Sequence, residues 1–311
     1  MSSNPLDKIL RPRFPACAVG FEKDAIAVVQ LERGRGGFAV KRAASVILPA
    51  DLVRPGFDEN NIGDPADLAA ALSDLLTSAG LLRQRKWSVT LPEATTRSAV
   101  LALEGTPSRR ELEEVLEWKI ERTFGAPLSE MRVNREQLPP NAQNQVRYLA
   151  TAVRLSVLEE YESVFRALGW QAGLILPRHA GEEQWLRHGS QGDGLLLTAH
   201  DEGFTAVLMR GERALTLRSV FCEPAECDDE LHRVLLFYRE RSGNNGEGAV
   251  DRLLVVGDSL DKQRVSEVAS ETLGVNLRPM AAADVGLVIP ASGDLDFDAI
   301  AAPAGLARLA W

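Results

Sequence analysis

The chain has 311 residues, of which 45% are hydrophobic and 25% are charged, which is typical of a globular protein of about two domains. Its formal net charge of −9 argues against a nucleic-acid-binding protein, because phosphate binding needs a basic face. Three cysteines are too few for a disulfide framework and fit a reducing, intracellular compartment. No stretch approaches the roughly 20 apolar residues of a membrane helix, so we expect any membrane association to go through a partner.

Three strand-like segments open the chain, after a basic N-terminus that lacks the apolar run of a signal peptide. We expect these strands at 18–22, 25–31 and 37–48. The Gly-rich segment 32–37 predicts a hairpin turn between the last two. A helix should follow, with Asp64 as its N-cap, Pro65 in its first position and Gly80 at its end. The beginning of the chain is therefore predicted to be an antiparallel meander followed by a helix.

The stretch from Trp87 to Gly169 is typical of a small α/β module set inside a longer chain. Its predicted strands lie at 87–91, 100–103, 132–137 and 145–153. We expect the first two to be neighbours and the last two to form a hairpin across the turn at 139–141. A second amphipathic helix then ends at Gly169, a natural C-terminal cap.

The first helix of this module has two alternative starts. Either Thr106 caps the helix with Pro107 in its first turn, or Ser108 and Glu111 form a capping box. In both cases one face is apolar and is expected to point inward, and it carries Leu112, Val115, Leu116 and Ile120.

The pattern of the first segment repeats after the module. The expected elements are a strand at 171–176, a short helix at 179–188, strands at 195–200, 204–210 and 214–220, a helix at 228–241, a strand at 252–256, a helix ending at 273 and a final helix at 298–309. A three-stranded meander followed by a helix and a strand thus occurs twice. This repetition implies an approximately duplicated α/β core.

Five short segments resemble, in order and spacing, those of a known family. They are VTLP at 89–92, ELEE at 111–114, FGAPLSE at 124–130, YLATAVR at 148–154 and APAGLAR at 302–308. The chain resembles the PilM family of type IV pilus assembly proteins and, more distantly, the cytoplasmic part of the secretion protein GspL. The resemblance implies an actin-like, ribonuclease-H-like α/β fold. On this basis we expect a first core subdomain at 14–86, an inserted module at 87–170, a second domain at 171–297 and a C-terminal helix at 298–311 that returns to the first subdomain.

The resemblance also implies a nucleotide pocket, where Mg-nucleotide lies between two β-hairpins and a Gly-rich turn. The corresponding residues are Gly20, Lys23, Asp24, Asp201, Gly203, Gly257, Asp258 and Ser259. In the first hairpin Gly20 replaces the acidic residue, and Glu22 stands where a glycine should admit phosphate, with Lys23 compensating in part. The second hairpin has Asp201 and Gly203 in the wrong order, and the turn keeps half of a Gly-Gly pair. We therefore expect a degenerate pocket with no catalytic residue and no cofactor, and ATP with Mg²⁺ is the disfavoured alternative.

Two patterns suggest metal sites only superficially. Cys222, Cys227 and His232 lack a fourth ligand and the usual spacing of a zinc site, so we interpret the thiols as structural or incidental. The alternating acids of 294–298 resemble a calcium loop but lack its glycine and its final glutamate. Capping of the last helix by Asp298 is the better interpretation. We predict no metal site.

The resemblance implies a cytoplasmic scaffold rather than an enzyme. It would bind the short N-terminal tail of a PilN-like inner-membrane protein in a groove between the inserted module and the first core subdomain, within a type IV pilus or secretion platform. Trp118 lies off the apolar helix stripe and is either a packed edge residue or an exposed anchor. We predict Trp118, Glu121 and Arg122 as partner contacts. An active actin-like ATPase is the alternative, and a small-molecule kinase of the same superfamily is third.

Overall fold

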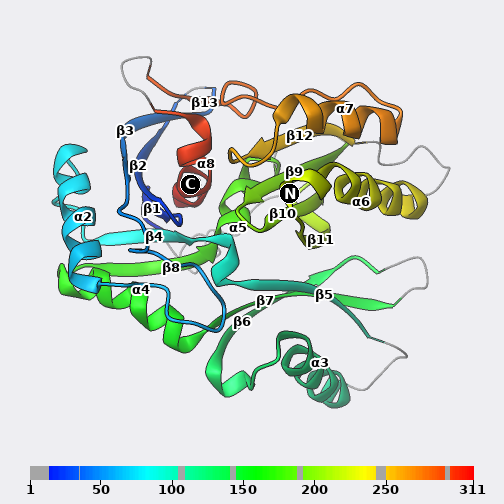
Figure 1. The fold of residues 1–311 in the computed structure, drawn as a ribbon, viewed down its shortest axis with the longest axis horizontal. Coiled ribbons are helices and arrows are strands. Elements are labelled where there is room, and N and C mark those ends of the chain that lie inside the picture. The colour runs from blue at the N-terminus through cyan, green and yellow to red at the C-terminus, as the bar shows by residue number, and fades with distance from the viewer. Residues whose placement is uncertain are drawn as a thin grey trace, which may run out of the picture.

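The computed structural model describes residues 14–34, 36–103, 109–140, 145–187, 192–242, 250–290 and 295–311. Within these ranges the strands form two core sheets and a smaller third sheet (Figure 1). The two alternative starts predicted for the first helix of the module, at Thr106 and Ser108, lie outside the described residues. The acidic residue Asp294 also lies outside them. None of the described helices combines the length and apolar character that would let it span a membrane.

The first core sheet has six strands in the order β13-β3-β2-β1-β4-β8. Their bounds are β1 (Cys17–Phe21), β2 (Ala25–Arg33), β3 (Phe38–Ile47), β4 (Lys86–Leu91), β8 (Gln171–Pro177) and β13 (Leu287–Val288). Strands β1 to β3 are antiparallel neighbours, whereas β4 pairs in parallel with β1, and β8 in parallel with β4. The predicted N-terminal meander is confirmed.

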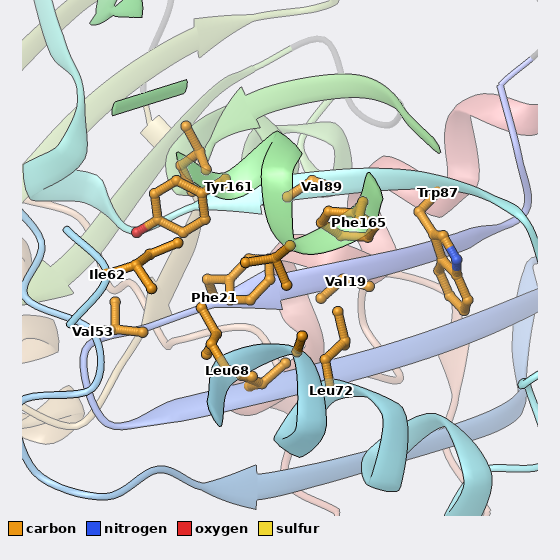
Figure 2. Packing of buried hydrophobic residues seen from close by; sticks show 14 of the residues in the cluster. Val19, Phe21, Val53, Ile62, Leu68, Leu72, Trp87, Val89, Tyr161 and Phe165 are labelled. Atoms are coloured by element: carbon orange, nitrogen blue, oxygen red, sulfur yellow. The ribbon is translucent and has the colours of Figure 1, made fainter. Parts of the chain in front are cut away.

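Helices α2 (Pro65–Ser78) and α4 (Leu155–Ala167) pack together against one face of this sheet. The Asp64 side chain accepts hydrogen bonds from the backbone N–H groups of Ala66 and Asp67, so the predicted N-cap is confirmed. In the core, the rings of Tyr161 and Phe165 meet Phe21 edge to face, with centroids 5.2 and 6.1 Å away (Figure 2).

The second core sheet has the order β11-β10-β9-β12, and it repeats the first arrangement. Its strands are β9 (Asp193–His200), β10 (Gly203–Arg210), β11 (Arg213–Phe221) and β12 (Val250–Val256). Strands β9 to β11 are antiparallel neighbours, and β12 runs parallel to β9. Helices α6 (Cys227–Ser242) and α7 (Lys262–Leu273) cover one face of the sheet. The predicted duplication of the core is confirmed.

Helix α8 (Phe297–Ala307) lies between the two core sheets (Figure 1). Its buried residues share one apolar cluster with strands of both sheets. Helix α5 (Arg178–Glu182) crosses α8 at very short range, since a Cβ built on Gly305 would come within 1.9 Å of the Gly181 carbonyl oxygen. A glycine at position 305 of α8 is therefore needed for this backbone contact.

The third sheet contains β5 (Arg97–Leu103), β6 (Met131–Leu138) and β7 (Val146–Arg154) in the order β5-β7-β6. Helix α3 (Arg109–Phe124) packs on it, and the predicted β6–β7 hairpin is confirmed. The prediction that the strands at 87–91 and 100–103 are neighbours is wrong, because β4 pairs with β1 and β8 while β5 pairs with β7. Helix α4 packs in the hydrophobic core of the first sheet. The inserted sheet therefore covers a shorter stretch of chain than the module expected at 87–170.

Candidate functional site

The structure brings the three predicted pocket segments together between the two core sheets. Lys23, in the β1–β2 turn, forms an ion pair with Asp201, in the β9–β10 turn, at 2.6 Å. Both side chains are exposed, and Asp24 lies exposed in the same turn as Lys23. At Gly257, after β12, a Cβ would come within 3.2 Å of the Arg178 guanidinium. The two hairpins and the turn thus lie close together, with Arg178 between them.

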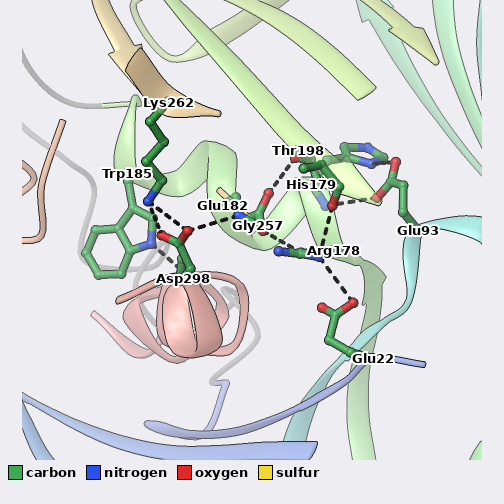
Figure 3. A network of polar contacts seen from close by, with 12 residues as sticks. Glu22, Glu93, Arg178, His179, Glu182, Trp185, Thr198, Gly257, Lys262 and Asp298 are labelled. Carbon is green, nitrogen blue, oxygen red and sulfur yellow. Dashed lines mark hydrogen bonds and ion pairs between the residues drawn. The ribbon is translucent and has the colours of Figure 1, made fainter. Parts of the chain in front are cut away.

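Arg178 is the centre of a buried polar cluster that the sequence did not predict (Figure 3). Its Nε donates to Glu182 Oε1 at 2.7 Å, and its Nη1 donates to Glu22 Oε2 at 3.2 Å and to the Ala199 carbonyl at 3.2 Å. The Thr198 hydroxyl donates to the other oxygen of Glu182. Because Glu22 belongs to the first hairpin and Ala199 to β9, one guanidinium connects both core sheets.

The carboxylates around Arg178 have perturbed proton affinities. Partial burial raises the pKa of Glu22, although the Arg178 charge opposes this rise. Burial also raises the pKa of Glu182, again against the effect of Arg178. Burial disfavours the charged form of Arg178, but Glu22 and Glu182 outweigh it and move its pKa further above the ordinary value. The guanidinium is therefore charged at any physiological pH.

A second buried pair lies beside this cluster. The His179 Nδ1 is 2.7 Å from Glu93 Oε1, and the His179 backbone N–H donates to the other carboxylate oxygen at 3.2 Å. Burial raises the pKa of Glu93, but the contacts with His179 dominate and lower it to about 2. Glu93 correspondingly raises the pKa of His179 in spite of burial. The contact thus favours the imidazolium-carboxylate form of the pair.

Two of the predicted pocket glycines have packing roles. A Cβ on Gly20 would lie 3.0 Å from the Pro303 ring and from the Thr90 hydroxyl oxygen, so this glycine lets β1 approach α8. Gly203 has φ +137°, and a Cβ there would lie 2.2 Å from the Val220 carbonyl oxygen. Both glycines are accounted for by contacts within the protein itself.

The acids at the start of α8 lie next to the turn that follows β12. Asp258, Asp296 and Asp298 each place one carboxylate oxygen within 4.8 Å of the others. Asp298 also accepts from the Gly257 backbone N–H at 3.2 Å and from Lys262 Nζ at 2.8 Å. The α8 N-cap is Asp296, so the prediction that Asp298 caps the helix is wrong, and Asp298 lies in the first turn instead.

The remaining predicted pocket residue, Ser259, donates from its hydroxyl to the His200 carbonyl at 3.2 Å. Sequence reasoning missed the buried cluster and its neighbouring pair, which comprise Glu93, Arg178, His179 and Glu182. One signal was present, because Arg178 and Glu182 have the i,i+4 spacing that brings side chains together on a helix. The remaining contacts join segments far apart in the sequence, which no spacing rule predicts.

The predicted partner residues lie on α3 of the inserted sheet. Trp118 is 54% exposed, and the Arg122 guanidinium lies 5.1 Å from its ring centroid. Val115, expected to point inward, is 39% exposed, so that expectation is wrong. Glu121 accepts a hydrogen bond from the Leu128 backbone N–H at 2.8 Å and so supports the turn after the helix. Trp118 and Val115 together give α3 an exposed apolar strip.

The loop between β3 and α2 joins the first core to the inserted sheet. Phe57 of this loop is buried in the apolar cluster of the insert, where the Arg97 guanidinium lies 4.4 Å from its ring centroid. Asp58 accepts from Arg97 at 2.8 Å and from Arg154 at 3.0 Å. The boundary between insert and first core therefore has a fixed apolar and ionic contact.

The two core sheets, each with an antiparallel meander and a parallel strand beside its first strand, define an actin-like α/β protein with a small inserted sheet. The predicted fold is confirmed. A solved structure of the PilM-PilN type IV pilus biogenesis complex matches the chain with a TM-score of 0.73 at 20% identity, covering 96% of this chain and 99% of that chain. The predicted resemblance to PilM is confirmed at the level of the fold.

Two further solved structures are similar at lower scores. The cytoplasmic domain of EpsL, an inner membrane component of the type II secretion system of Vibrio cholerae, has a TM-score of 0.43 and 12% identity over 82% of this chain and 94% of that chain. A Bacteroides thetaiotaomicron protein with an actin-like ATPase fold has a TM-score of 0.47 and 11% identity over 93% of this chain and 94% of that chain. No family model matches the sequence, and no curated protein matches it.

Proposed function

We propose that this chain is a cytoplasmic scaffold of a type IV pilus or related secretion platform, and that it binds the N-terminal tail of a PilN-like inner-membrane protein. The observation that carries the proposal is the full-length similarity to the chain of the PilM-PilN complex. The partner would hold this chain at the inner membrane. Other platform proteins would bind to the same assembly.

The partner site proposed here combines the exposed strip on α3 with the boundary between the insert and the first core. Trp118 supports this choice, because an aromatic ring that is half exposed and stacked by Arg122 is a typical anchor for a partner chain. The Arg97, Asp58 and Arg154 contacts keep the neighbouring boundary fixed, so a bound tail would meet a preformed surface.

Titration calorimetry with a synthetic tail peptide tests this proposal. The peptide is the N-terminal tail of a PilN-like membrane protein. We expect saturable binding that Trp118→Ala weakens about tenfold or more, equivalent to about 1.4 kcal/mol. Phe221→Ala is the matched control, since Phe221 is a 70% exposed aromatic residue at the end of β11. Absence of binding at high peptide concentration would reject the proposal.

The second part of the proposal is that the pocket between the hairpins does not bind nucleotide. In support, Glu22, Glu182 and Glu93 bring three carboxyl groups into this region, where Arg178 and His179 are their hydrogen-bonded counter-charges. The Arg178 contacts with Glu22 and Glu182 also occupy donors that a phosphate would need.

Calorimetric titration with Mg-ATP tests the pocket separately from the tail. We expect no binding in the micromolar range and no ATP hydrolysis above a buffer control. Micromolar affinity for Mg-ATP would favour the alternative function, an active actin-like ATPase in pilus assembly, and would leave the tail-binding result to be judged by itself.

A further inference from the structure

Two thiols lie in contact where β11 leads into α6. Cys222 directly follows β11, Cys227 is the first residue of α6, and a single short turn separates them. Their Sγ atoms are 2.7 Å apart, about 0.7 Å beyond a covalent S–S bond of about 2.05 Å. Joining the two sulfur atoms therefore requires only a small side-chain movement.

The surroundings of the pair differ from those of the third cysteine and of the nearby histidine. His232 Nδ1 lies 2.7 Å from the Thr272 hydroxyl, a contact on α7 rather than with the two thiols. Cys17 is buried in β1 of the first core sheet. Cys222 is partly exposed whereas Cys227 is buried, so an oxidant from solution reaches Cys222 first.

We propose that Cys222 and Cys227 form a reversible intrachain disulfide by exchange with a low-molecular-weight disulfide. The Cys222 thiolate attacks one sulfur of the oxidant, forms a mixed disulfide and releases the first small thiol. The Cys227 thiolate then attacks Cys222 Sγ, which forms the internal S–S bond and releases the second small thiol. The protein pair loses two electrons and two protons, and the oxidant takes up both as two thiols.

The bond would act on the hairpin next to the buried cluster. The Cys222 backbone N–H donates to the Glu202 carbonyl at 3.0 Å, and Gly203 pairs with Phe221. Asp201, in the same turn, forms the ion pair with Lys23 across to the first core sheet. A disulfide at Cys222 therefore fixes the strand end that supports this hairpin. Because the closed loop is short, the disulfide stabilises the whole protein less than one that closes a long loop, and its main effect is on the adjoining hairpin.

The rate of this chemistry depends on pH. Burial and the contact with Cys227 raise the pKa of Cys222 to about 12. The thiolate is consequently scarce near neutral pH, and the rate of exchange should rise about tenfold per pH unit between pH 7 and pH 9. Oxidation would thus be slow under mild conditions and complete only on prolonged exposure to the oxidant.

Peptide mapping of the full chain tests the proposal, with oxidised glutathione as the probe at pH 8. After acid quenching, free thiols are alkylated with iodoacetamide and the protein is digested with trypsin. Both cysteines lie on the tryptic peptide 219–233, and Cys17 lies on 14–23. We expect peptide 219–233 to lose two hydrogens and its alkylation, whereas Cys17 stays alkylatable after unfolding. Excess reduced glutathione should restore the dithiol.

Two variants separate the steps. Cys227→Ser should retain a stable glutathione adduct at Cys222, because no second thiol resolves it, whereas Cys222→Ser should leave the buried Cys227 unmodified. Circular dichroism checks that both variants fold like the parent chain. A doubly alkylated peptide after prolonged oxidation, or a persistent glutathione adduct on Cys222 in the parent chain, would overturn the proposal. Amide exchange of the hairpin at 200–204 should become slower in the oxidised form.

Discussion

Replacing Arg178 by methionine should destabilise the protein strongly, because the change leaves Glu182 without its counter-charge. The Glu182 side chain is 0% exposed, and Arg178 donates to it at 2.7 Å. Breaking a buried ion pair by removing one partner costs about 3–5 kcal/mol, since an uncompensated charge remains inside the protein. Glu22 adds less, because its side chain is 33% exposed and can regain water.

Urea unfolding followed by circular dichroism measures this loss. With an m value of about 3 kcal/mol per M, the midpoint of Arg178→Met should fall by about 1–1.7 M at pH 7.5. The loss should shrink as the pH falls, because burial already raises the pKa of Glu182 and the variant removes the charge that opposes this rise.

The double variant Arg178→Met with Glu182→Gln is the matched control. It removes both charges and keeps an amide oxygen for the Thr198 hydroxyl, so most of the midpoint should return. The reasoning is refuted if the single variant shifts the midpoint by less than about 0.3 M, or if the double variant is as unstable as the single one.

Three further predictions concern the same region. Since the pKa of Glu93 is lowered from 4.5 to about 2, its ionised form stabilises the fold above pH 4.5, and this contribution is lost as the pH falls toward 2. The variant Glu93→Gln should remove this acid dependence and lower the free energy of unfolding by about 3 kcal/mol at pH 7. Urea unfolding across a range of pH values measures both effects. Gly20→Ala should cost about 1–3 kcal/mol because of its contacts with Pro303 and Thr90, whereas Gly36→Ala, with nothing within 4 Å, should leave the melting temperature unchanged. Asp201→Ala should change stability by less than about 1 kcal/mol, because its ion pair with Lys23 is exposed, and a larger loss in thermal unfolding would contradict this interpretation.

Local patterns predicted the elements of the fold well where hydrophobic period and capping agree. The Asp64 cap with Pro65 identified the start of α2, and the repeated meander identified the two core sheets. The same patterns could not assign β4 and β5 to their sheets, because two short apolar runs separated by a polar turn fit a hairpin equally well. Strand partners depend on contacts across the whole chain, which spacing does not encode.

The buried cluster was hidden for a related reason. Glu93 and Arg178 are 85 positions apart in the numbering, and each by itself is indistinguishable from a surface charge. Only the fold shows that Arg178 and His179, at the start of α5, lie between the end of β4 and the second hairpin. Two of the predicted pocket glycines, Gly20 and Gly203, also serve backbone packing, which the sequence pattern did not indicate.

The buried cluster around Arg178 also helps to join the two core sheets. In this chain the two core sheets are joined by α8 and by Arg178, which binds Glu22 on one side and Ala199 and Glu182 on the other. Contacts supplied by the protein itself thus join the two core sheets. A frame held together by such contacts would lower the ordering cost of binding a flexible tail. The geometry of the cluster therefore supports the proposed scaffold role.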